Sequence, residues 1–599
     1  MYSLNYPLSF TNFKVFYSTS NFSFTSLPVH LRFIWLPHIS YSAWHNFLRS
    51  YLWFIGKTKS FLKESPFKMR KFFKLISGRK SKIVNSHIQI MVEKLKSCES
   101  AEIKQSNNED IKISLITMLK QFCERKCISQ RMNEIIQDSR NQQLITYSKE
   151  SIMMSALAIF LFRMGSGNKF DGKTHDNDEK YSKANIAKFI GAPESQVPVI
   201  KTIEEFLVHL KENSINQLMI AFFKDLQNSK FFVQHPQIMP GEFFLLAIDC
   251  VHTHTYNHPH HVDSNGNNDC ECCLKRVHNK GTDKEYVQWQ HLNLIFSFVF
   301  MGGLKIPIYS YPIHAKQITN LESASEDSYK QECELVGLKI ALPTIREAFP
   351  KMKIVLLLDG LYANRPVIRL VEEQRCGYII VRKQACLPLL AIECDACALN
   401  TNHRKNCTKK TNKMYKGWLI EQEYEWFNSK YLGEGVSTNV LRFIEIRTNE
   451  KKEKVECYKC EWLFSWKLSW NNCEFSALQA RSRWEIEDLF NSLKQRGYRL
   501  KHDYSRNPLS CFHWQSLALF AFGIFELFRF SESVQTRGNW TQTALAEKLL
   551  GQLIHSPTEE IFSNRCLSKR IQFRYHFIVE LVLSCQVHQS YDLTGYNTG

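Results

Sequence analysis

The hydrophobic and polar positions of the chain alternate between uninterrupted apolar runs and segments with helical spacing. Two apolar runs, 243–248 and 354–358, each end in a single acid, Asp249 and Asp359. Runs of this length, bounded by polar or turn residues, are typical of strands buried on both faces of a sheet. Open α/β sheets bind ligands beyond the carboxyl ends of their strands, so both carboxylates are expected at a ligand-binding edge. Either Asp alone also fits a helix cap or a turn.

The segments between and after the two acids predict an α/β fold. Two aromatic and β-branched runs predict strands, and Gly302 and Gly303 between them are typical of a hairpin. The expected later strands are 286–300, 305–313, 354–358 and 377–381, and the expected helices are 329–349 and 366–374. The order strand, strand, strand, helix, strand, helix, strand indicates a ribonuclease H-like catalytic core. Asp249 then closes the first strand, and Asp359 closes the fourth.

The segment 483–494 predicts an amphipathic helix with charged chemistry on one face. Each residue of a helix advances about 100°, so Arg483, Glu487 and Lys494 lie within roughly 40° of one another. An adjoining face carries the spacing of a buried stripe. Its members are Ile486, Leu489, Phe490 and Leu493. From this segment alone, an ordinary helix with solvated charges is an equal interpretation.

These motifs resemble those of bacterial insertion-sequence transposases of the DDE type, in the IS-four group with the motif Tyr-x2-Arg-x3-Glu-x6-Lys. Arg483, Glu487 and Lys494 match that spacing, whereas Ala480 stands at the Tyr position. The resemblance covers roughly residues 142–530. It implies a mobile-element enzyme that cuts at the ends of its element and joins the freed 3′ ends to target DNA. It also implies a homodimer in the synaptic complex, and Ala480 leaves open whether a hairpin intermediate forms.

The chemistry of phosphodiester cleavage suits the same residues. Two Mg²⁺ ions, or Mn²⁺, activate the nucleophile and neutralise the leaving oxygen, and such hard cations take oxygen ligands. Asp249, Asp359 and Glu487 are therefore the expected catalytic and metal-binding residues. Arg483 and Lys494 are expected to bind phosphate, the first as a fork and the second as a point charge.

The formal net charge of +19, from 77 Lys and Arg against 58 Asp and Glu, is consistent with binding to double-stranded DNA. Beyond the predicted helix, Arg496, Arg499 and Lys501 are further candidates for phosphate contacts. Basic residues also gather at 404–416, although any one such run fits a solvated surface equally well. No P-loop is present, so nothing implies nucleotide hydrolysis.

A segment at 386–479 is predicted as a β-rich insertion, which the resemblance places before the catalytic Glu. Its strand-like runs are 418–426, 440–447 and 455–466. In the family an aromatic side chain of this insertion can stack on an extruded base. The candidates are Trp418, Trp426, Trp462 and Trp466, and for each a place in the core is the alternative.

The nineteen cysteines suggest thiols or metal ligands, because disulfides are disfavoured in the cytoplasm, where the protein is expected to associate with the nucleoid. One candidate structural Zn²⁺ site is Cys270, Cys273 and His278, within a His-rich segment after Asp249. A second is Cys394, Cys397, His403 and Cys407. Free thiols in a loop are the alternative for both sets.

The ends of the chain carry fewer signals. No run of about 20 apolar residues is present, and the apolar stretch 514–528 is expected to be a core helix rather than a membrane span. Met69 looks like an ordinary start, which makes 1–68 a non-native or disordered extension. The predicted parts are 1–68; a helical, DNA-end-binding region at 69–235; the first part of the core at 236–385; the insertion at 386–479; the final core helices at 480–530; and 531–599, with no assigned role.

Two other classes of function fit the sequence. A decayed or domesticated transposase would bind DNA without catalysis, and Ala480 and the His-rich segment agree with that interpretation. A host nuclease or resolvase of the same fold is the other alternative. Short inverted repeats flanking the gene would distinguish a transposase from such a host enzyme.

Overall fold

The computed structural model describes residues 113–175, 181–239, 242–314, 326–383, 385–449, 455–538, 540–564, 571 and 573–575, with the backbone alone at His254 and at 326–333. All of them belong to one compact unit, Ile113–Phe577. The predicted extension at 1–68 and the proposed start at Met69 lie outside the described residues.

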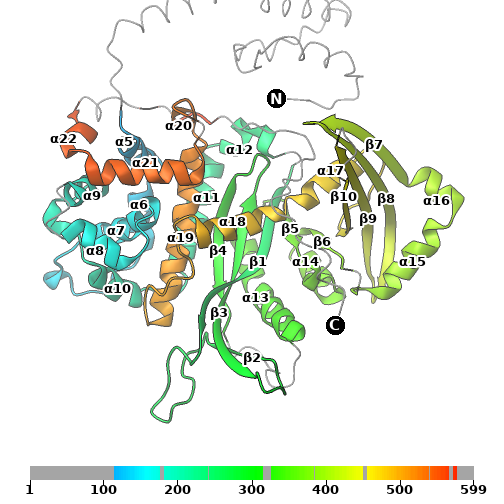
Figure 1. Cartoon of the computed structure of the whole chain (residues 1–599), viewed down its shortest axis with the longest axis horizontal. Coiled ribbons are helices and arrows are strands. Elements are labelled where there is room, and N and C mark those ends of the chain that lie inside the picture. The colour runs from blue at the N-terminus through cyan, green and yellow to red at the C-terminus, as the bar shows by residue number, and fades with distance from the viewer. Residues whose placement is uncertain are drawn as a thin grey trace, which may run out of the picture. The chain divides into compact units, whose positions relative to one another are not determined.

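The protein has a mixed α/β fold built on one ten-stranded sheet (Figure 1). Nine strands follow one another in the order β2-β3-β1-β5-β6-β10-β9-β8-β7. The tenth, β4, lies off this path and also pairs with β3. Strands β1, β5 and β6 are parallel to one another, and the other pairs are antiparallel. The first six strands are β1 (Phe244–Tyr256), β2 (Leu274–His278), β3 (Tyr286–Val299), β4 (Lys305–Pro312), β5 (Ile354–Leu358) and β6 (Gly377–Val381).

The apolar runs form these strands because both faces of the sheet are covered. Every residue of β4 and β5 is buried, and α11 (Ser214–Asn228), α13 (Glu326–Ala348) and α19 (Pro508–Arg529) all pack against β4. Gly302 and Gly303 turn the chain between β3 and β4 with positive φ angles of 81° and 80°, a conformation that favours glycine. The predicted strands, the hairpin and both helices of this region are therefore confirmed in type and order.

The predicted β-rich insertion has its three expected strands, but it is not separate from the central sheet. Its strands are β7 (Thr408–Tyr415), β8 (Trp418–Gly433), β9 (Val436–Asn449) and β10 (Val455–Phe464), preceded by α15 (Pro388–Ala398) and α16 (Thr401–Asn406). Strand β10 pairs with β6, where Trp462 lies opposite Val381, so the sheet continues into the insertion. The sequence gives no sign of β7, because that strand alternates Lys, Thr and Asn without an apolar face.

The described part of the predicted amino-terminal region, from Ile113 on, is helical. It includes α8 (Gly167–His175) and α9 (Ser182–Ile190) after Gly165, and α10 (Ile200–Val208) before α11. The remaining helices here are α5 (Leu115–Arg125), α6 (Ile128–Ile135), α7 (Lys149–Leu161) and α12 (Phe231–Gln234). Gly191 ends α9 at a φ of 78°, and α10 begins only at Ile200. This connection is longer than the 3–4 residues of a helix-turn-helix.

The carboxyl-terminal helices complete this helical region. Helix α21 (Gln542–His555) packs against α5 and α9. The Leu115 N–H donates to Gln552 Oε1 at 3.1 Å, and Asn185 Nδ2 donates to the Leu553 carbonyl at 2.8 Å. The short helices α20 (Glu532–Gln535) and α22 (Thr558–Ile561) flank α21. The described part of 531–599 therefore has a structural role that the sequence did not indicate.

One helix in the described part of the chain, α19, is long and apolar enough to cross a membrane. Its whole apolar window is buried inside the protein, against α7, α11 and β4. The expectation of a core helix is confirmed.

Candidate active site

Asp249 and Asp359 lie at equivalent positions on neighbouring parallel strands. Ala247 of β1 pairs with Leu357 of β5, and each acid comes two residues later. Asp359 ends its strand as predicted, whereas β1 runs on to Tyr256 because it keeps pairing with β3 after it has left β5. Asp249 therefore marks the point where β1 and β5 separate rather than the end of its strand.

Helix α18 (Trp484–Gln495) packs against β1, β3 and β4 and carries Glu487. The predicted stripe of Ile486, Leu489, Phe490 and Leu493 is buried, which fixes the orientation of the helix. Arg483 is its N-cap residue rather than its first helical residue, and it donates a hydrogen bond from Nη2 to Glu487 Oε1 at 2.6 Å. The helix begins after a tight connection from α17 (Cys473–Arg481), in which Ala480 is buried.

The Arg483 guanidinium lies in the electrostatic field of all three predicted acids. Its side chain is only 13% exposed. Burial alone would lower the pKa of Arg483, but the charges of Glu487, Asp249 and Asp359 outweigh burial, so the pKa is raised. The three acids come from β1, β5 and α18, so the fold brings these distant segments around one buried cation.

Asp359 has two contacts that orient its carboxylate. Its Oδ1 accepts a hydrogen bond from the Leu361 N–H at 2.9 Å, and its Oδ2 lies 3.9 Å from Lys383 Nζ. The Lys383 side chain crosses Gly360 so closely that a Cβ there would lie 2.6 Å from Lys383 Cγ. Gly360 thus leaves room for a lysine beside the acid, a contact that the sequence did not indicate.

Tyr362 is a second neighbour that the sequence did not indicate. It is fully buried, and its hydroxyl has no hydrogen-bonding partner among the residues that the structure describes. Burial raises the pKa of Tyr362 well above its ordinary value, and the charges of Glu334, Asp249 and Asp359 raise it further. The Tyr362 phenol, close to Asp249 and Asp359, therefore stays neutral.

Lys494 lies at the far end of α18 and is half-buried. Burial lowers the pKa of Lys494, the positive charge of Lys501 lowers it further, and the charge of Asp249 opposes both effects. Lys494 thus lies near enough to Asp249 and to the exposed Lys501 for their charges to affect it. Arg499 is also exposed, as expected of a residue that contacts phosphate.

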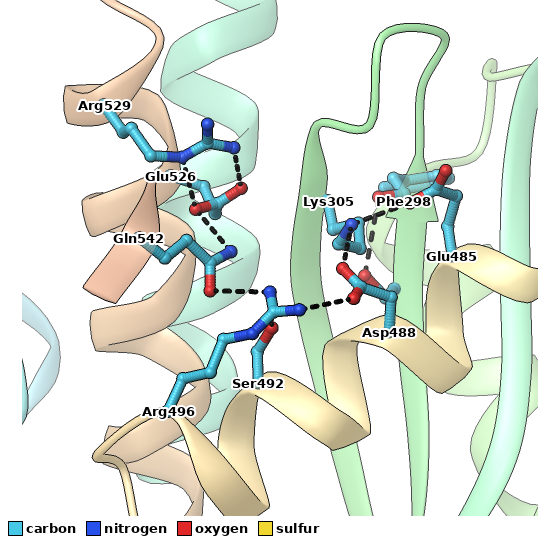
Figure 2. A network of polar contacts seen from close by, with 10 residues as sticks. Phe298, Lys305, Glu485, Asp488, Ser492, Arg496, Glu526, Arg529 and Gln542 are labelled. Atoms are coloured by element: carbon cyan, nitrogen blue, oxygen red, sulfur yellow. Dashed lines mark hydrogen bonds and ion pairs between the residues drawn. The ribbon is translucent and has the colours of Figure 1, made fainter. Parts of the chain in front are cut away.

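Arg496 was predicted to contact phosphate, but its guanidinium belongs to an intramolecular network of polar contacts (Figure 2). Its guanidinium contacts Asp488 Oδ1 at 3.2 Å, Ser492 Oγ at 3.0 Å and Gln542 Oε1 at 3.3 Å. Gln542 Nε2 in turn donates to Glu526 Oε1 at 2.8 Å. Arg496 therefore ties α18 to α19 and α21.

The same network anchors α18 to the sheet through Lys305 of β4 (Figure 2). The Lys305 side chain is 4% exposed, and its Nζ lies 2.7 Å from Glu485 Oε2 and 2.9 Å from Asp488 Oδ2. Burial alone would lower the pKa of Lys305, but these acids raise it. The first turns of the helix that carries Glu487 are therefore held by a buried ammonium.

The pKa of Asp488 predicts a dependence of stability on pH. Burial alone would raise this pKa, but Lys305 and then Arg496 lower it below the ordinary 3.8. Asp488 therefore contributes stability above about pH 4, and the contribution is lost as the pH falls through the lowered pKa. We expect Asp488→Asn to lose about 1 kcal/mol in urea unfolding at pH 7. If the wild type and Asp488→Asn differed in unfolding free energy by the same amount at pH 3 as at pH 7, this role would be contradicted.

The four tryptophans proposed to stack on a base differ in exposure. Trp426 and Trp462 are 3% and 1% exposed, so they belong to the core. Trp418 and Trp466 are half-buried, and Trp466 Nε1 donates to Ser476 Oγ at 3.2 Å. The tryptophans exposed most among the described residues, Trp470 at 54% and Trp484 at 47%, were not candidates.

The second predicted zinc set is not brought together. Cys397 Sγ accepts a hydrogen bond from Lys430 Nζ at 3.0 Å, and the His403 ring stacks on Phe427 with centroids 4.6 Å apart. Burial raises the pKa of Cys394 to about 12, and burial also raises the pKa of Cys407. Among the described residues, these four do not form a group whose ligand atoms lie within 4.8 Å of one another.

Of the first predicted set, Cys270 belongs to a group of possible metal ligands among the described residues, Cys273 lies beside that group, and His278 is not part of it. His278 ends β2, and its ring stacks on Tyr286 with centroids 4.7 Å apart. His260 and His291 lie beside the two cysteines instead. His260 belongs to the His-rich segment of the sequence, whereas His291 gave no signal because it lies in a strand far from the other histidines and the cysteines of the sequence motif.

The donor set of Asp249, Asp359 and Glu487 consists of carboxylate oxygens, which hard divalent cations prefer. In the arrangement described, the three do not form a group with all ligand atoms within 4.8 Å, and Arg483 pairs with Glu487. A divalent ion held by these carboxylates would therefore compete with Arg483 for the negative charge of Glu487.

No protein-family model matches the sequence, and no curated protein matches it. The resemblance to DDE transposases therefore depends on the motif residues and their spacing within this chain.

Proposed function

We propose that the protein is a DDE transposase, which cleaves DNA at the ends of an insertion element and joins the freed 3′ ends to target DNA. The observation that carries the proposal is that Asp249 and Asp359 lie at the same level of two adjacent parallel strands, while Glu487, paired with Arg483, lies on the helix that packs against β1. Acids from two adjacent parallel strands and from one packed helix suit phosphodiester chemistry, which needs ligands that converge from separate elements.

The strand order supports a ribonuclease H-like core. Strands β4, β3, β1, β5 and β6 are adjacent in that order, with β3 antiparallel to both of its neighbours and β1, β5 and β6 parallel. This is the plan predicted from the order of elements along the chain. The insertion then extends the same sheet beyond β6 before the chain returns as α18.

In this proposal Asp249, Asp359 and Glu487 hold two Mg²⁺ or Mn²⁺ ions. When bound, such ions activate a water or a 3′-hydroxyl and neutralise the charge on the leaving oxygen. Arg483 is released from Glu487 and turns toward a phosphate of the substrate. Lys494 and Lys501 supply further positive charge beside the same acids, and Lys305 keeps α18 in place.

The competition between Arg483 and the metal predicts opposite effects of one substitution. Arg483→Gln removes a buried positive charge beside the acids, so we expect Mn²⁺ to bind several-fold more tightly, by about 1 kcal/mol. We expect DNA cleavage to fall, because a phosphate contact is lost. Isothermal titration with Mn²⁺ and a cleavage assay measure the two effects.

Arg499→Gln is the matched control for this experiment, because it removes an exposed positive charge outside the acid cluster. It should leave Mn²⁺ affinity unchanged. Equal Mn²⁺ affinities of the Arg483→Gln and Arg499→Gln variants would contradict the competition.

The direct test of the function uses DNA that carries the terminal repeats flanking the gene, with the full chain and Mn²⁺. Nicking at the repeat ends followed by joining to a second duplex supports the proposal. Binding without nicking favours the decayed copy. Cleavage of junctions or unrelated duplexes, together with a gene that lacks flanking inverted repeats, favours a host nuclease or resolvase.

Two further features of the proposal follow from the family resemblance. The protein would act as a homodimer on double-stranded DNA, associated with the nucleoid. A hairpin route is disfavoured by Ala480, which is 3% exposed on α17, so no phenol lies at this position and a Tyr there would overpack its surroundings.

A further inference from the structure

A second cluster of metal-ligating side chains lies outside the candidate active site, on β3 and on the connection between β1 and β2. His260, Cys270 and His291 each offer a ligand atom, and these atoms all lie within 4.8 Å of one another. His291 Nε2 lies 3.4 Å from Cys270 Sγ and 3.2 Å from Cys273 Sγ. One thiol and two imidazoles therefore lie close together, and the Cys273 thiol adjoins His291 outside this group of three.

Three residues of this cluster are buried, and His260 is half-buried. Cys270, Cys273 and His291 are 3%, 1% and 5% exposed. Both ring nitrogens of His260 are buried, and neither finds a hydrogen-bonding partner among the described residues. A buried imidazole without a partner costs free energy, and a bound cation would remove that cost.

The backbone holds the four side chains in place. The Cys273 N–H donates to the Cys270 carbonyl at 3.2 Å, which closes a turn between the two cysteines. The His260 N–H donates to Cys273 Sγ at 3.2 Å, and the His260 ring stacks on Tyr256 with centroids 5.0 Å apart. The His291 carbonyl accepts a hydrogen bond from Thr253 Oγ1 at 3.3 Å. Such surrounding contacts orient metal ligands.

We propose that His260, Cys270, Cys273 and His291 form a structural Zn²⁺ site. Two sulfur and two nitrogen ligands in a buried cluster favour tetrahedral Zn²⁺ over the hard cations that carboxylates hold. Four protein ligands leave no open position, so the site is structural rather than catalytic. The inference goes beyond the proposed function and does not depend on it.

The site has a specific structural consequence. Its ligands join the long connection after β1 to β3, and the His261 ring of that connection contacts the Arg506 carbonyl, between α18 and α19. Zinc therefore fixes the segment that follows the exposed Arg499 and Lys501.

The test measures metal in the full chain after incubation with Zn²⁺ and gel filtration. We expect about one zinc per chain by mass spectrometry of the metal. Replacement by Co²⁺ should give the charge-transfer absorption of thiolate ligands, which reports binding without any activity assay. A folded wild-type chain that retains no zinc would overturn the proposal.

Variants identify the ligands. Cys270→Ser with Cys273→Ser should lose the zinc, and so should His291→Ala. The matched controls Cys272→Ser and His278→Ala change adjacent residues outside the cluster and should keep it. If the double variant fails to fold, hydrogen exchange of the wild type with and without a chelator replaces it. Faster exchange at 257–278 and 503–511, with helix α7 unchanged, is expected, and uniform or no change would overturn the proposal.

Discussion

We expect Asp249→Asn, Asp359→Asn and Glu487→Gln each to lower Mn²⁺-dependent DNA cleavage by at least ~10³-fold. Each substitution removes one anionic ligand while keeping the size of the side chain. Because the three acids act as one unit around the metal, double variants should be no worse than single ones. Rates of nicking on terminal-repeat DNA measure the effect.

Glu372→Gln on α14 (Arg365–Glu373) is the matched control, since Glu372 is an exposed acid outside the acid cluster. It should cleave at the wild-type rate. Thermal unfolding of each variant shows that it is folded. A variant of Asp249, Asp359 or Glu487 that keeps most of the cleavage activity would exclude that residue from the catalytic set.

The second large effect is expected at Lys305, which no sequence motif marks. Lys305→Met removes a cation that is 4% exposed and contacts both Glu485 and Asp488. The substitution leaves Glu485 without this partner and Asp488 with its contact to Arg496, and both acids, 32% and 40% exposed, regain some water. We therefore expect a loss of about 1–3 kcal/mol in urea unfolding, together with reduced cleavage, because α18 loses its anchor to β4.

Lys353→Met provides the comparison. Lys353 forms an ion pair of similar length with Glu242, at 2.6 Å, but both side chains are largely exposed. Such a pair contributes less than about 1 kcal/mol. If Lys305→Met and Lys353→Met lost the same unfolding free energy, the buried position of Lys305 would have no special role.

The sequence predicted the features that depend on local periodicity. The spacing of Ile486, Leu489, Phe490 and Leu493 predicted α18 and its buried face, and Arg483 and Glu487 form the contact expected of residues four apart. The apolar runs before Asp249 and Asp359 predicted their strands. Both signals are local, because neighbouring positions alone determine which face of an element is buried.

The features that the sequence did not reveal depend on distant partners. Arg496 looks like an exposed cation until Gln542 and Asp488 are seen beside it. His291 lies within β3, and its partners Cys270 and Cys273 come from the connection that precedes β2. Similarly, the pairing of β10 with β6 joins segments some 80 positions apart, roughly the separation of Val381 from Trp462.

The central claim is that Asp249, Asp359 and Glu487 share divalent metal ions. Anomalous diffraction from crystals of the full chain soaked in Mn²⁺ tests it most directly. We predict Mn²⁺ between Asp249 and Asp359, in contact with Glu487, with the Arg483 guanidinium displaced from Glu487. Manganese found only elsewhere, with the Arg483 to Glu487 ion pair intact, would contradict the proposed DNA chemistry.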